Sequence, residues 1–106
     1  MRVKKIKELL DEKKALDITD YDFTNSDYFV DYVIIATAMA DKHAQSLLNH
    51  LKTNLKPLGE TFLGIDESDD WIVIDLGDIL IHLMSEEYRA KYQLDKLMQD
   101  IKSKNI

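Results

Sequence analysis

Residues 71–84, WIVIDLGDILIHLM, are the most informative segment of this chain about its architecture. Two runs rich in β-branched and large apolar residues lie on either side of Gly77-Asp78. A two-residue loop of this composition joins antiparallel strands into a tight hairpin. The sequence therefore predicts a hairpin in which Leu76 lies opposite Ile79.

The register of this hairpin brings several kinds of side chain onto one face. It pairs Asp75 with Leu80, Val73 with His82 and Trp71 with Met84. Asp75 and His82 are then diagonal neighbours, about 7–8 Å apart at Cα, and a carboxylate there can raise the pKa of an imidazole or orient it as a base. Three interpretations remain open: an acid–base pair, a histidine that is hydrogen-bonded only within the sheet, and a pair that contacts a partner beside Trp71.

The segments before the hairpin predict two helices and two strands. Apolar residues recur every three or four positions in residues 2–14 and 41–55, which is typical of helices, and Asp41 is expected to cap the second. Residues 18–23 alternate, which indicates a strand with one wet face, and residues 30–37 are almost continuously apolar, which favours an interior strand.

The remaining segments complete the expected architecture. A short apolar piece at 62–65 precedes an acidic turn at 66–70, and Ser85 is expected to cap a last helical region. The apolar stripe of that region consists of Leu94, Leu97, Met98 and Ile101. We expect a single domain, residues 1–106, of the α/β (α+β) class, with a mixed sheet that contains the hairpin and has helices packed on it.

Composition narrows the function classes. The chain is 45% hydrophobic and carries a net charge of −6, which argues against direct binding of nucleic acid and suits a basic protein partner. The absence of cysteine excludes disulfides, thiolate zinc sites and cysteine nucleophiles. No run is apolar enough for a bilayer span or a signal peptide, so we expect a cytoplasmic protein without membrane contact.

Several motifs, in order along residues 5–98, resemble the ribosomal silencing factor (Iojap-like) family. They are Lys14-Ala15-Leu16-Asp17-Ile18, Asp31-Tyr32-Val33-Ile34-Ile35-Ala36-Thr37, Lys42-His43, Trp71 with Asp75-Leu76-Gly77-Asp78 and His82, and Arg89, Tyr92, Leu94, Asp95 and Leu97. The chain departs from the family pattern at Ala38, Ala40, Asp95 and Met98, where Gly, Ser, Glu and Trp are usual.

The resemblance implies a fold related to nucleotidyltransferases but without catalytic residues, and without a cofactor. It further implies binding to a large-subunit ribosomal protein at the intersubunit face, which would block the small subunit and repress translation when nutrients are short. A homodimer of the free protein is also implied.

Two other classes of function are weighed beside this resemblance. Asp20 and Asp22 share a strand face, the arrangement with which a nucleotidyltransferase holds magnesium, but residues 6–16 contain no Gly or Ser to grip a triphosphate. The acidic turn lacks the pattern of a calcium loop, and His43 and His50 are about 10.5 Å apart along a helix, too far for one metal ion. A simple dimerisation module is the second alternative.

The residues expected to contact the partner combine an aromatic anchor with charged and polar groups. Trp71 is the anchor, Asp75, Asp78 and Glu67 are acceptors for Lys or Arg, and His82, Arg89 and Tyr92 support them. Two internal roles remain open: Asp78 can simply satisfy the turn, and Arg89 can pair with Asp75 or Asp78.

Overall fold

Five strands form one mixed sheet in the computed structural model, which describes residues 2–104. Their bounds are β1 Leu16–Asp22, β2 Tyr32–Ala38, β3 Gly64–Ser68, β4 Trp71–Asp75 and β5 Ile79–Ser85. The order across the sheet is β1-β2-β5-β4-β3; β2 and β5 are parallel, and the other neighbours are antiparallel. The predicted fold class is confirmed.

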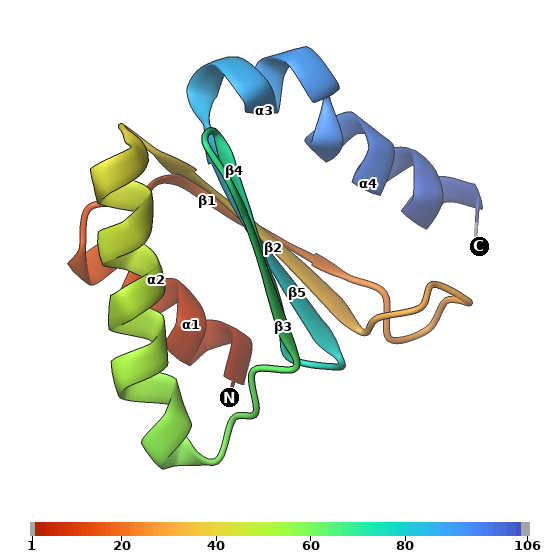
Figure 1. Ribbon diagram of the computed structural model, residues 1–106. Coiled ribbons are helices and arrows are strands. Elements are labelled where there is room, and N and C mark those ends of the chain that lie inside the picture. Colours follow the sequence, from red (N-terminus) through yellow and green to blue (C-terminus); the bar gives the residue numbers. More distant parts are fainter. Residues whose placement is uncertain (1, 105–106) are drawn as a thin grey trace.

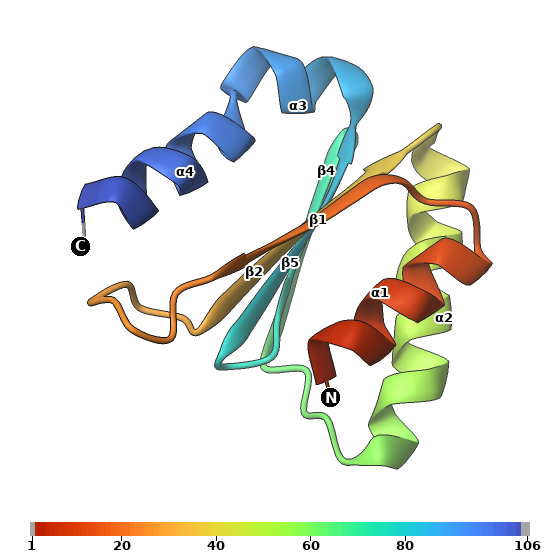
Figure 2. The ribbon, with the colours of Figure 1, turned by 180° about the vertical axis from the view of Figure 1, so that it is seen from behind.

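Helices cover both faces of the sheet. The helices α1 (Arg2–Glu12) and α2 (Asp41–Leu55) lie on one side, and α3 (Glu86–Tyr92) and α4 (Leu94–Lys104) lie on the other (Figures 1 and 2). A short 3-10 helix, η1 (Lys56–Leu58), follows α2. Two separate cores result, one on each face.

The larger core lies between the sheet and the pair α1 and α2. The apolar stripes of the helices are buried in it: Val3, Ile6, Leu9 and Leu10 from α1, and Ala44, Leu47, Leu48, Leu51 and Leu55 from α2. Because successive residues of a strand point to opposite faces, β2 supplies Ile34 and Ala36 to this core and Val33 and Ile35 to the other. The two helices and the interior strand are therefore confirmed.

The smaller core lies under α3 and α4. Its buried members are Tyr21, Phe23, Val30, Val33, Ile35, Met84, Leu94 and Met98. The last helical region is two helices, because Gln93 adopts a left-handed φ of 49° between them. Leu94 and Met98, four residues apart, face the sheet, and Leu97 is 49% exposed; its assignment to the apolar stripe is therefore wrong.

Two further expectations need correction. The acidic turn expected at 66–70 is confined to Asp69-Asp70, because residues 66–68 continue β3 and pair with β4. An edge strand tolerates exposed carboxylates, which is why composition alone misleads there. Asp41 is the first residue of α2 rather than its cap; Ala40 occupies the cap position.

The hairpin and the start of α3 follow the sequence closely. Leu76 N–H donates to the carbonyl of Ile79 at 3.0 Å, and Gly77 has a φ of 95°, a conformation that glycine adopts without strain. The register is the one predicted. Ser85 caps α3, since its hydroxyl oxygen accepts from the N–H of Tyr88 at 3.2 Å.

Candidate protein-binding face

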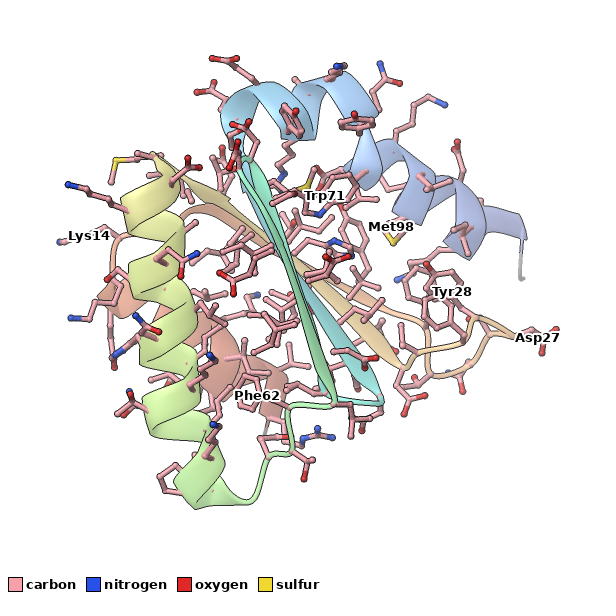
Figure 3. The ribbon with its side chains drawn as sticks, viewed as in Figure 1. Lys14, Asp27, Tyr28, Phe62, Trp71 and Met98 are labelled. Carbon is pink, nitrogen blue, oxygen red and sulfur yellow. The ribbon has the colours of Figure 1, made fainter. Side chains whose placement is uncertain are left out.

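Five residues of the β4–β5 hairpin make up what we call the Trp71 face: Trp71, Val73, Asp75, Leu80 and His82. Four of them are partly exposed, and His82 is buried beneath them. The neighbouring strand β3 adds exposed Asp66 and Ser68, which pair with Val73 and Trp71. Figure 3 shows Trp71 between the sheet and the two C-terminal helices.

A hydrogen bond fixes the indole of Trp71. Its Nε1–H donates to Nδ1 of His82 at 3.0 Å, and the ring centroids are 5.9 Å apart. The imidazole is therefore neutral, with its proton on Nε2. Burial lowers the pKa of His82 to about 4, so the upward shift expected from Asp75 is wrong. Asp75 instead accepts from the N–H of Gly77 at 2.7 Å.

The stability of the fold is expected to fall as the pH falls through the window set by His82. The folded pKa of about 4 lies below the ordinary value of 6.5, so the unfolded chain binds the proton more strongly. The contribution of neutral His82 to the free energy of unfolding is complete above pH 6.5. It declines toward pH 4, by about 2–3 kcal/mol. Urea unfolding at about pH 7 and about pH 4.5 measures this difference.

The matched control is His82→Asn, which offers an oxygen acceptor to the indole but does not titrate in this range. Asp95 and Asp78 have pKa values below their ordinary 3.8, so their contributions are lost only at lower pH. An equal loss in the variant and the parent would contradict the assignment to His82.

Aromatic rings extend the Trp71 face onto α3. Tyr92 lies 5.3 Å from Trp71 and 5.5 Å from Tyr88 between ring centroids, and Tyr92 is 49% exposed. The Nζ of Lys91 lies over both tyrosine rings, at 5.6 Å and 5.4 Å from their centroids. The sequence-predicted Trp71, Asp75, His82 and Tyr92 are thus brought to one side of the sheet.

Arg89 connects α3 to the sheet and to α4. Its Nε and Nη2 donate to the two carboxylate oxygens of Asp95 at 2.8 and 3.0 Å. Its Nη1 donates to the Asp17 carbonyl at 2.7 Å and to Oγ1 of Thr37 at 3.0 Å, and Nη2 also donates to Oγ1 of Thr19 at 2.8 Å. The predicted pairing of Arg89 with Asp75 or Asp78 is wrong, because the guanidinium binds groups of β1, β2 and α4 and not the β4–β5 hairpin.

Asp95 is the residue of this site that sequence reasoning missed. Hydrogen bonds from Arg89 lower its pKa to about 2, and the hydroxyl of Tyr21 also donates to it, at 2.6 Å. Burial and this bond to Asp95 raise the pKa of Tyr21 to about 12. The sequence placed Asp95 in the closing motif, at a position where Glu is usual, but gave it no role, because its distance from Arg89 across a helix break carries no periodic signal.

Two predicted partner residues lie away from the Trp71 face. Glu67 faces the larger core side, where its carboxylate accepts from the side-chain amide of Gln45. Asp78 lies in the β4–β5 turn, and Arg2 binds both it and Glu60. The hydrogen bond from Arg2 holds the pKa of Asp78 below its ordinary value.

The carboxylates weighed as a magnesium site have local partners. Asp20 pairs with Nζ of Lys7 at 2.7 Å, and Asp22 accepts from the N–H and hydroxyl of Thr24. Within residues 2–104, no three His, Asp or Glu side chains are grouped to hold a metal ion. No helix in this range is long and apolar enough to cross a membrane.

Comparisons with known proteins agree with the resemblance drawn from the motifs. A family model described as "Ribosomal silencing factor during starvation" matches residues 1–106. The chain is 34% identical over 92 residues to a ribosomal silencing factor of Haemophilus influenzae, covering 85% of this chain and 90% of that protein. It is 30% identical over 94 residues to "Mitochondrial assembly of ribosomal large subunit protein 1" of Mus musculus, covering 84% of this chain and 41% of that protein. A crystal structure from Chromobacterium violaceum aligns with a TM-score of 0.84 at 27% identity, covering 92% and 84% of the two chains.

Proposed function

The chain belongs to the ribosomal silencing factor family, and on this basis we propose that it binds a basic protein of the large ribosomal subunit and thereby prevents the small subunit from joining. Translation is then repressed when nutrients are limiting. The site of attachment is the intersubunit face of the large subunit. Family membership is the observation that carries this proposal.

The Trp71 face supports this proposal as the docking surface. The face holds the fixed indole and the carboxylate of Asp75, and its neighbours add the half-exposed Tyr92 of α3 and the carboxylate of Asp66 on β3. Aromatic anchors surrounded by polar groups are typical of the residues that dominate binding energy. The net charge of −6 favours a basic partner, because opposite charges speed the encounter and fix its orientation.

Occupancy alone accounts for silencing. The domain measures 37 × 33 × 21 Å along its principal axes, which is large enough to exclude another surface from the one it covers. No bond needs to form or break in this mechanism. The hydrogen bond to His82 holds the indole, and the two hydrogen bonds from Arg89 to Asp95 hold α3, before the partner binds. This order lowers the entropic cost of binding.

Sedimentation of separated ribosomal subunits through a sucrose gradient tests the proposal. Added protein is expected to travel with the large subunit and to reduce the fraction of joined ribosomes in proportion to its occupancy. Tyr92→Ala should weaken both effects, whereas Leu97→Ala, on α4 and equally exposed, should not. Undisturbed subunit joining at saturating protein contradicts the proposal.

A further inference from the structure

A groove of about 530 Å³ lies between α1 and β1, on the sheet face opposite the Trp71 face. Val3, Ile18 and Tyr32 are its apolar lining; Val3 belongs to the larger core, and Ile18 and Tyr32 pack against that core. Lys4, Lys7, Glu8, Asp11, Asp20 and Asp22 line its sides. The silencing mechanism makes no use of this groove.

The groove opens onto the free edge of the sheet. Strand β1 is the outermost strand, and within residues 2–104 it pairs only with β2 (Figure 2). The N–H of Phe23 donates toward β2, to the carbonyl of Asp31 at 2.7 Å. Because backbone groups alternate in direction along a strand, those of Asp20 and Asp22 point outward, beside the groove.

Carboxylates flank the apolar lining on both sides. Glu8 and Asp11 are three residues apart on α1, and Asp20 and Asp22 are two apart on β1, so each pair shares a face. Lys7 neutralises Asp20 through a contact of 2.7 Å between Nζ and Oδ1. The four carboxylates outnumber the two lysines, so the groove carries net negative charge.

We propose that the edge of β1 binds an extended segment of a partner protein in which Lys or Arg occupies alternate positions. The segment adds a strand to the sheet through the outward backbone groups of Asp20 and Asp22. Its basic side chains enter the groove, where their alkyl stems cover Val3 and Ile18 and their charged ends meet Glu8 and Asp11. A second copy of β1 is disfavoured, because it would bring aspartates against aspartates.

A capped peptide of about eight residues that alternates Lys and Thr is the probe, since it spans the seven residues of β1. Titration into the ¹⁵N-labelled full chain is expected to give a Kd below about 1 mM and to slow amide exchange at Asp20 and Asp22. The same peptide with Glu in place of Lys is expected not to bind. Glu8→Lys combined with Asp11→Lys should weaken binding at least about tenfold.

The matched control combines Asp27→Lys with Asp69→Lys, which changes the net charge equally at exposed carboxylates outside the groove. Its Kd should stay within about twofold of the parent. Equal weakening in both double variants, exchange protection on another strand, or no binding by the parent overturns the inference. The assay contains no ribosomal component, so the outcome of the peptide titration is independent of the proposed silencing function. Trp71→Ala should bind the peptide with the affinity of the parent.

Discussion

Replacing Trp71 with alanine is expected to weaken binding to the large ribosomal subunit by at least about 2 kcal/mol, which is about 30-fold in Kd. The substitution removes the indole that we propose as the anchor, and with it the ring against which Tyr92 packs. It also removes the donor to Nδ1 of His82. Equilibrium binding of labelled protein to purified large subunits measures the change.

Trp71→Phe separates the two contributions of the indole. Phenylalanine keeps an aromatic ring for the partner and for Tyr92 but cannot donate to His82. We expect its Kd to lie between those of the parent and Trp71→Ala. Far-UV circular dichroism and thermal unfolding establish that each variant is folded at the temperature of the binding assay. Unchanged affinity in folded Trp71→Ala removes the indole from the interface.

The second large effect is expected on stability, from Arg89→Ala. This change leaves the carboxylate of Asp95 without its main partner. It also removes the donor to the Asp17 carbonyl and to the hydroxyls of Thr37 and Thr19. The side chain of Arg89 is only 11% exposed, whereas that of Asp95 is 31% exposed and regains some water. We therefore expect a loss of about 3 kcal/mol, measured by urea unfolding near neutral pH.

Two variants distinguish the paired hydrogen bonds between Arg89 and Asp95 from a general effect of charge. Arg89→Lys keeps the charge but has no planar fork to bind both oxygens of Asp95, so it should recover less than half of the loss. In a double-mutant cycle, Arg89→Ala and Asp95→Asn should be strongly non-additive, because they remove the same interaction. Additive losses would show that Arg89 acts mainly through Thr19, Thr37 and Asp17.

Local rules predicted the parts of the site that depend on short sequence distances. The turn at Gly77-Asp78 was sufficient to place Trp71, Asp75 and His82 on one face, because a two-residue loop leaves a single register. The spacing of apolar residues likewise identified α1 and α2. Within the hairpin and these helices, the residues that lie side by side follow from the local backbone geometry, which residues close in sequence determine.

The partners of the charged residues were not predictable in this way. Arg89 reaches Asp17 and Thr19 across separations of 72 and 70 residues, and Arg2 reaches Asp78 across 76. These contacts depend on the path of α3 and on the order of strands in the sheet. The turn at Gln93 sets that path, and a glutamine in a left-handed conformation gives no advance signal of a helix break.

The two cores of unequal size lie on opposite faces of the sheet, so we expect the molecule to contain two cooperative units. The helices α3 and α4 contribute only to the smaller core, which they cover together with residues 23–30, so we expect them to detach while α1, α2 and the sheet keep the larger core intact. Such a sub-global opening requires less free energy than complete unfolding. Trp71 on β4 and Tyr92 on α3 are in ring contact, so we expect a partner bound at both residues, as proposed, to suppress this opening as well as to occupy the surface.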